Sequence, residues 1–208
     1  MIKTIEYIDG VVRMIDQTRL PAEKEFVDCR TIEEVGHAIK TMVIRGAPAI
    51  GVAAAMGVSL GADSIEASTF ESFYQALEEK CDRLGQSRPT AVNLAWAIKR
   101  MKDVAQSNKS LSIAKLKSRL KEEALTILTE DIATNKAMGQ HGQTLVKDGN
   151  VILTHCNAGA LATAGFGFMC PNFLHAYFIK CLSVRFSLKS IDSSSELLIL
   201  PPFTLTVT

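Results

Sequence analysis

The sequence feature that most constrains the fold is a run of 17 residues without a charged side chain, residues 46–62. The run begins with Gly46 and contains three further glycines, a proline and a serine. It falls short of the roughly 20 apolar residues that a membrane-spanning helix needs. Pro48 suits the first turn of a helix. The run therefore predicts a helix buried in the core of a folded domain, and we expect no contact with a membrane.

A small antiparallel sheet is expected before this helix. Residues 2–15 alternate between polar and apolar side chains around Asp9-Gly10, a dipeptide typical of a two-residue hairpin turn. Residues 25–28 can supply a third short strand. A capping-box spacing, Thr31 with Glu34, predicts that a helix follows the sheet.

Three longer patterns predict helices after the buried run. Ser68 and Glu71 have capping-box spacing and open a pattern whose apolar face contains Phe70, Phe73, Tyr74, Leu77, Cys81 and Leu84. Thr90 is expected to cap the next helix, whose buried stripe is Leu94, Ala97, Ile98, Met101 and Ala105. From about Ser112 to Leu145 the pattern indicates one long helix or two helices end to end.

A second domain is expected to begin near residue 148. Residues 151–154 form a β-branched apolar run, as in the first strand of a parallel α/β sheet, but a doubly wound sheet needs more residues than remain. All 13 glycines lie at or before Gly167, where the composition changes. We therefore expect an α/β fold: a mixed N-terminal domain (1–147) of a small antiparallel sheet plus helices, the truncated start of a Rossmann-like parallel-sheet domain (148–167), and a divergent, poorly ordered tail (168–208).

The net charge and the cysteines exclude several kinds of binding partner and site. Lys and Arg number 23 against 22 Asp and Glu, so the broad positive field that binds nucleic acid or anionic lipid is absent, and neither partner is expected. Five cysteines without a CxxC pair argue against a disulfide framework and a zinc site. With no secretory signal pattern at the N-terminus, a reducing cytoplasm fits best.

Two arginines precede expected helix starts. Arg45, followed by Gly46 and Ala47, lies directly before the buried helix, and Arg88 lies just before the helix that Thr90 would cap. A helix N-terminus beside an arginine favours an anion such as phosphate, and two such corners could clamp one phosphate ester. The alternatives are that Arg45 pairs with a carboxylate at an ordinary turn and that Arg88 is a surface arginine.

Cys156 lies in the turn after the expected strand at 151–154. Ligands of open α/β sheets bind beyond the carboxyl ends of strands, and a helix N-terminus there would favour a reactive thiolate. The alternative is that Cys156 is a small buried apolar residue, as free cysteines often are.

Taken together, residues 42–53, 87–96 and 153–165 resemble the methylthioribose-1-phosphate isomerases of methionine salvage. The resemblance covers residues 1–167, roughly the first half of a family chain, and implies a Rossmann-like second domain and a homodimer. It places the family's phosphate-binding Arg-Gly-Ala on Arg45, Gly46 and Ala47, its second ligand-binding arginine on Arg88 and its catalytic cysteine on Cys156. The family's catalytic aspartate and Asn-Lys pair have no counterpart in this sequence.

The activity that this resemblance implies is an aldose–ketose isomerisation of a small sugar phosphate, 5-methylthioribose 1-phosphate, to 5-methylthioribulose 1-phosphate. It implies no metal and no organic cofactor, and it leaves both a hydride and an enediol route open. Because the aspartate segment is missing, we expect the chain itself to be weak or inactive. The alternatives are a ribose-1,5-bisphosphate isomerase and a non-catalytic regulatory subunit of the initiation factor 2B type.

Overall fold

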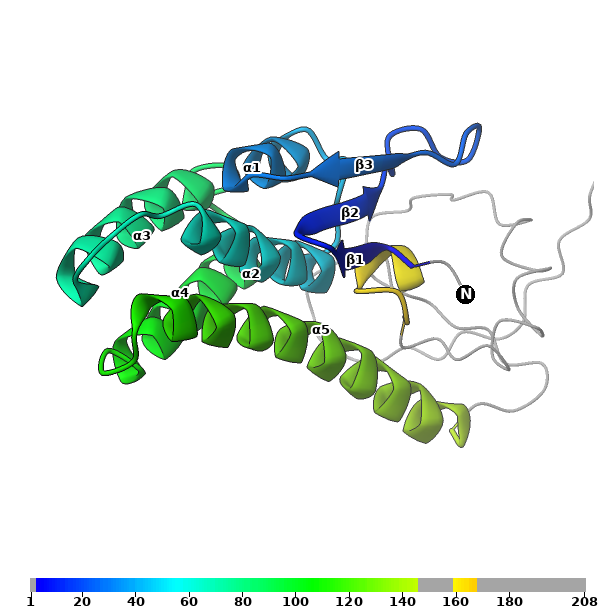
Figure 1. Cartoon of the computed structure of the whole chain (residues 1–208). Coiled ribbons are helices and arrows are strands. Elements are labelled where there is room, and N and C mark those ends of the chain that lie inside the picture. Colours follow the sequence, from blue (N-terminus) through cyan, green and yellow to red (C-terminus); the bar gives the residue numbers. More distant parts are fainter. Residues whose placement is uncertain (1–2, 146–158, 168–208) are drawn as a thin grey trace, which may run out of the picture.

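The structure is a computed structural model that describes residues 3–145 and 159–167 of the 208-residue chain (Figure 1). The expected strand at 151–154, Cys156 and the expected tail at 168–208 lie outside the described residues. The predictions made for them remain predictions.

A three-stranded antiparallel sheet opens the chain, in the order β1-β2-β3. Its strands are β1 (Ile5–Ile8), β2 (Val11–Ile15) and β3 (Phe26–Cys29). Asp9 and Gly10 form the turn between β1 and β2 with φ of 48° and 78°, the pair of positive values that a type I′ hairpin requires. Tyr7 pairs with Val12, and Met14 pairs with Val27. The predicted hairpin and third strand are confirmed.

Five α-helices and one short 3-10 turn complete the described fold (Figure 1). They are α1 (Ile32–Lys40), α2 (Ala47–Asp63), α3 (Phe70–Gly85), α4 (Val92–Ser107), α5 (Ile113–Gln143) and the turn η1 (Ala160–Ala162). The region from 112 to 145 thus contains one long helix, not two. The prediction of a mixed α/β fold with a small antiparallel sheet is confirmed.

Helix α2 is the centre of the core, as its uncharged sequence predicts. It contacts the four other helices, β1, β2 and η1, and every residue from 49 to 62 is buried. Glycines permit the closest approaches: a Cβ at Gly51 would lie 3.3 Å from the Asn93 carbonyl oxygen of α4, and one at Gly57 would lie 2.9 Å from Val35 Cγ1 of α1. The neighbouring helices therefore pack directly against the α2 backbone.

The expected apolar faces of α3 and α4 are those that the structure buries. Phe73, Leu77, Cys81 and Leu84 of α3 are buried, while Phe70 and Tyr74 are partly buried against the same core. On α4 the predicted stripe and the buried set are identical.

Two of the three predicted caps differ from the structure. The Thr31 capping box is present: the Glu34 N–H donates to Thr31 Oγ1 at 3.1 Å, and Glu34 Oε2 accepts from the Thr31 N–H. Ser68 is not a cap, because the extended residue directly before α3 is Thr69, whose Oγ1 accepts from the Ser72 N–H at 3.2 Å. Thr90 is not a cap either.

A turn that precedes α4 moves the start of this helix past Thr90. The Ala91 N–H donates to the Arg88 carbonyl oxygen at 2.9 Å, and this turn delays the helix until Val92. Ala91 becomes the N-cap, which has no side chain able to accept a bond from the helix. Helix α4 therefore begins without a side-chain cap, as α2 does.

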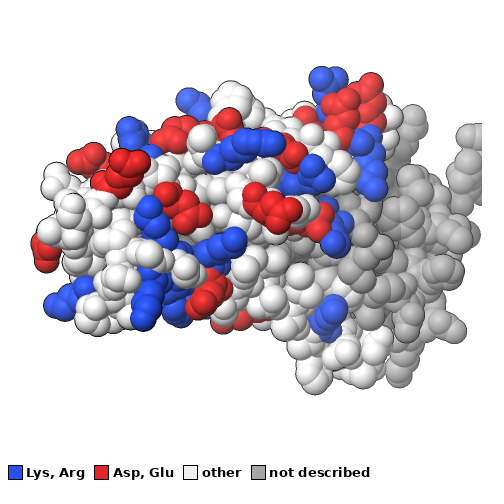
Figure 2. Space-filling model, in the orientation of Figure 1, with Lys and Arg blue, Asp and Glu red and all other residues white. Residues whose placement is uncertain are grey.

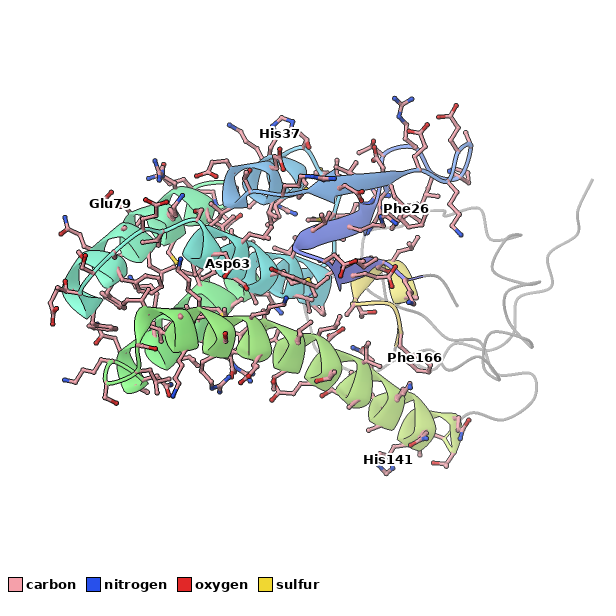
Figure 3. All side chains as sticks on the ribbon, in the orientation of Figure 1. Phe26, His37, Asp63, Glu79, His141 and Phe166 are labelled. Atoms are coloured by element: carbon pink, nitrogen blue, oxygen red, sulfur yellow. The ribbon has the colours of Figure 1, made fainter. Side chains whose placement is uncertain are left out.

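Charged side chains of both signs are interspersed over the face drawn in Figure 2. This mixture agrees with the nearly balanced charge of the sequence. His37 of α1 and His141 of α5 are exposed on opposite sides of the molecule (Figure 3). Within residues 3–145 and 159–167, no helix has the length and apolar character needed to cross a membrane, and no group of acidic, His or Cys side chains could hold a metal ion.

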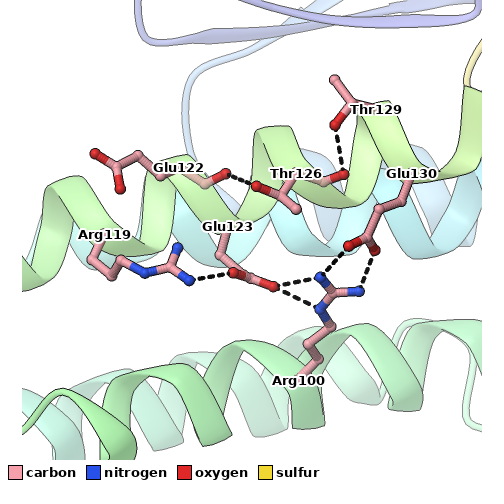
Figure 4. Close-up of polar contacts among 7 residues, drawn as sticks. All are labelled: Arg100, Arg119, Glu122, Glu123, Thr126, Thr129 and Glu130. Carbon is pink, nitrogen blue, oxygen red and sulfur yellow. Dashed lines mark hydrogen bonds and ion pairs between the residues drawn. The ribbon is translucent and has the colours of Figure 1, made fainter. Parts of the chain in front are cut away.

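A buried carboxylate joins α4 to α5 (Figure 4). Glu123 of α5 is 5% exposed and accepts from Arg100 Nε of α4 and from Arg119 Nη2, both at 2.7 Å. Arg100 also donates to Glu130 at 2.6 Å. Because every charge here has an opposite partner, the cluster tolerates burial and fixes the mid-portion of α4 against α5.

Candidate functional site

The start of α2 has the features of an anion site. Gly46 is the N-cap with φ 101° and ψ 130°, no side chain caps the helix, and its first turn has no acidic residue. The N–H groups of Ala47 and Ala49 have no carbonyl partner within the helix, and Pro48 between them has no N–H. Arg45, directly before them, is exposed. Ala47 is also exposed, whereas Ala49 is buried. A positive side chain and an exposed residue of the first helical turn therefore lie at the N-terminus of α2.

The segment 159–167 packs directly against this corner. A Cβ at residue 46 would lie 2.4 Å from Ala162 Cα and 2.5 Å from the Ala162 carbonyl oxygen. No real Cβ tolerates such distances to backbone atoms, so only glycine allows the contact. The chain thus returns, more than a hundred residues later, to cover the N-cap of α2 (Figure 1).

Side chains from three other parts of the fold bind the same segment. Thr4 Oγ1 donates to the Ala160 carbonyl oxygen, and Gln17 Nε2 donates to the Leu161 carbonyl oxygen, both at 2.7 Å. From α5, Asp131 Oδ2 accepts from the Ala164 N–H, also at 2.7 Å. The segment is therefore held by the chain before β1, the loop after β2 and α5.

Phe166, near the end of this segment, lies beside α5 (Figure 3). It is 8% exposed, and the Lys136 ammonium lies 5.4 Å from its ring centroid. This cation–π contact adds an apolar and electrostatic attachment to the three hydrogen bonds.

Gln17 connects the segment to Arg45. Its amide nitrogen also approaches the Arg45 carbonyl oxygen, and its amide oxygen accepts from Arg45 Nε, each at 3.4 Å. Among residues 3–145 and 159–167 no carboxylate forms an ion pair with Arg45. The described part of the chain therefore offers Arg45 no carboxylate partner, and the alternative that Arg45 pairs with a carboxylate is not supported there.

Arg88 lies at the same end of the helix pair as Arg45. The close approach of Gly51 to Asn93 places the N-terminal parts of α2 and α4 side by side. Arg45 lies two residues before α2, and Arg88 lies four residues before α4. Arg88 is half-buried. A doubly clamped phosphate remains a prediction for which the helix arrangement is suitable.

Cys156 lies outside the described residues, three positions before Gly159. The two cysteines that the structure does describe are both buried and free. Burial raises the pKa of Cys29 to about 11 and that of Cys81 to about 12, so neither thiol is a nucleophile at neutral pH.

Sequence reasoning missed Gln17 and Asp131. Burial raises the pKa of the Asp131 carboxyl, although hydrogen bonds from the Ala164 N–H and the Asn135 amide act in the opposite direction. Gln17 is 2% exposed. Gln17 lies in a loop, and Asp131 is one of several carboxylates on an amphipathic helix. The residues that they bind are distant in the sequence, so no local sequence pattern indicates either role.

A model of the initiation factor 2 subunit family matches residues 43–179. The methylthioribose-1-phosphate isomerase of Geobacter sp. (strain M21) is 56% identical over 165 residues, which are 79% of this chain and 48% of that protein. The protein of the same name from Geobacter sulfurreducens is 54% identical, with the same coverage. The chain thus spans about half the length of the curated relatives it matches.

Two solved structures have similar folds. The crystal structure of 5-methylthioribose 1-phosphate isomerase from Pyrococcus horikoshii OT3 matches with a TM-score of 0.75 and 42% identity, over 80% of this chain and 47% of that chain. The delta subunit of translation initiation factor eIF-2B from A. fulgidus matches with a TM-score of 0.71 and 39% identity, over 80% and 48%.

Proposed function

Because this chain belongs to the initiation factor 2 subunit family, we propose that it carries the phosphate-binding part of an aldose–ketose isomerase site. The substrate in this proposal is 5-methylthioribose 1-phosphate and the product is 5-methylthioribulose 1-phosphate. The observation that carries the proposal is the uncapped start of α2, with Arg45 beside it and segment 159–167 packed on Gly46. The names of the curated relatives support the choice of substrate.

In the proposed site the ester phosphate lies at the N-terminus of α2. The N–H groups at Gly46 and Ala47 and the Arg45 guanidinium bind its oxygens, and Arg88 from the turn before α4 supplies a second positive group. The anomeric phosphate prevents easy ring opening, so the enzyme must hold it while the ring oxygen is protonated. Binding energy from the phosphate is thereby converted into orientation of C1 and C2.

Cys156 is proposed to move a proton or stabilise the reacting centre as hydrogen passes between C1 and C2. The proposal includes neither a metal nor an organic cofactor. It treats residues 148–167 as the start of a Rossmann-like domain that follows the N-terminal domain (1–147), and it includes a cytoplasmic homodimer.

A second candidate is a non-catalytic subunit of the initiation factor 2B type. It is favoured by the likeness to the delta subunit, whose TM-score and identity are close to those of the isomerase structure. Such a subunit has no need to bind a sugar phosphate through Arg45. Phosphate binding therefore discriminates between the two candidates.

The test is calorimetric titration of the whole chain with 5-methylthioribose 1-phosphate, compared with the sugar that lacks the phosphate. Arg45→Ala should weaken binding by about 1.5 to 3 kcal/mol, the usual contribution of hydrogen bonds to charged groups. Arg83→Ala, at an exposed arginine of α3, removes the same charge and should leave the affinity unchanged. Equal affinity of wild type and Arg45→Ala, or no preference for the phosphorylated sugar, would contradict the proposal.

A further inference from the structure

We propose that Gln17 is a positioning residue that orients the Arg45 guanidinium for an anion and ties this orientation to the docking of segment 159–167. The inference rests on the proposed function, in which Arg45 binds the substrate phosphate. Gln17 itself is not expected to touch the substrate, because its side chain is almost completely buried.

Backbone hydrogen bonds hold the main chain at Gln17 in place. The Gln17 N–H donates to the Val43 carbonyl oxygen at 3.0 Å, and the neighbouring Asp16 N–H donates to the Glu25 carbonyl oxygen at 2.9 Å. The loop after β2 is therefore attached both to the turn before α2 and to the start of β3. The Gln17 side chain therefore extends from a fixed main-chain position near Arg45.

The orientation of the amide follows from its three partners. Two are carbonyl oxygens, of Leu161 and Arg45, which can only accept, and the third is Arg45 Nε–H, which can only donate. A glutamine with Nε2 towards the carbonyls and Oε1 towards the guanidinium satisfies all three. A carboxylate at this position would repel both carbonyl oxygens, and an apolar side chain would bind none of the three groups.

The hydrogen bond from Arg45 to Gln17 restrains the Arg45 side chain at the anion site. Arg45 is exposed and has several rotatable bonds, so an unrestrained guanidinium would lose conformational entropy on binding a phosphate. The bond to Gln17 uses the Nε–H and leaves the terminal N–H groups of the guanidinium for the ligand. Because the same amide binds Leu161, the guanidinium is restrained when segment 159–167 is docked.

The experiment is a double-mutant cycle on the whole chain, with affinity for 5-methylthioribose 1-phosphate measured by calorimetry. Gln17→Met preserves the volume and removes the amide. In the wild-type background it should weaken binding about 3- to 10-fold, the loss expected for one hydrogen bond. In the Arg45→Ala background it should have no further effect, because Gln17 acts through Arg45.

Thr4→Val is the matched control. It removes the hydrogen bond to Ala160, in the same segment, without removing a contact of Arg45, and should weaken binding less than Gln17→Met does. Gln17→Glu keeps an acceptor for Arg45 Nε but adds a carboxylate that competes with phosphate for the guanidinium, so it should weaken binding more than Gln17→Met. It serves as the second variant if Gln17→Met does not fold in thermal unfolding.

The outcomes are distinguishable. If Arg45→Ala weakens binding but neither Gln17 variant does, the Gln17 proposal is wrong and the proposed function stands. If Gln17→Met weakens binding equally in both backgrounds, or Thr4→Val weakens it as much, Gln17 acts by docking the segment and the positioning role is overturned. If Arg45→Ala binds as well as wild type, the proposed function itself fails.

Discussion

Ala162 Cα lies 2.4 Å from the point that a Cβ atom of residue 46 would occupy, so Gly46 and Ala162 form a backbone-to-backbone contact that no other residue at position 46 permits. The same glycine is the N-cap of α2 and has φ 101°. One residue thus determines both the start of a helix that has no side-chain cap and the position of a segment distant in sequence. The geometry of the candidate site depends on this contact.

Gly46→Ala is therefore expected to destabilise the fold by more than about 2 kcal/mol, since the backbone strain of a positive φ is added to a clash with backbone atoms. Gly10→Ala is the control, because Gly10 also has a positive φ but a Cβ there would meet nothing within 4 Å. It should cost about 1 kcal/mol. Urea unfolding measures both. Similar losses for the two variants would show that Ala162 does not pack on residue 46.

Much of the fold follows from local sequence. The uncharged run at 46–62 identifies the central helix because no amphipathic surface helix lacks charge over such a length. Asp9-Gly10 identifies the hairpin because both residues tolerate positive φ. The stripe on α4 repeats at the helical period. Each of these signals is contained within one element.

The rest depends on contacts between distant residues. Thr90 has the right chemistry for a cap, but a turn closed by the Arg88 carbonyl oxygen moves the helix start past it. Gln17 and Asp131 acquire their roles only when segment 159–167 returns to the N-terminal part of the chain. For the candidate site, the sequence identifies Arg45, Gly46 and Ala47, whereas the residues that hold them in place come from the packing.

The Asp131 carboxyl predicts a pH dependence of stability. Burial raises its pKa, so the folded state binds a proton more tightly than the unfolded state does. Its contribution to stability is therefore present below the ordinary carboxyl pKa of about 4 and is lost as the pH rises through the higher value of the folded state. Asp131→Asn should abolish this part of the pH dependence in urea unfolding between about pH 4 and neutrality. An unchanged profile would contradict the assignment.

Glu123 predicts the opposite dependence. Burial raises its pKa, but hydrogen bonds from Arg119 and Arg100 outweigh this effect and hold the pKa below its ordinary value. Its contribution is thus present above the ordinary glutamate pKa and is lost as the pH falls through the lower folded-state value. At neutral pH, Glu123→Gln should cost about 1 to 3 kcal/mol, because it leaves two arginines without a buried charged acceptor.

The matched control for Glu123 is Asp103→Asn. Asp103 pairs with Lys99 on the exposed surface of α4, where both side chains are more than half exposed. It should change the unfolding free energy by less than about 1 kcal/mol. If the two variants are equally stable, or if the cost of Glu123→Gln does not shrink in acid, the cluster in Figure 4 does not stabilise the α4–α5 contact.

The thiols provide the last prediction. With pKa values near 11 and 12 and buried sulfur atoms, Cys29 and Cys81 should react with iodoacetamide at pH 8 at least about 100-fold more slowly than a free thiol. In denaturant both should react at the ordinary rate. Mass mapping of the native protein then reports the labelling of Cys156 separately from that of Cys170 and Cys181, and we expect Cys156 to be labelled and to be protected by 5-methylthioribose 1-phosphate. Rapid native labelling of Cys29 and Cys81 would refute their burial, and labelling of Cys156 that the sugar phosphate does not slow would argue against its place in the proposed site.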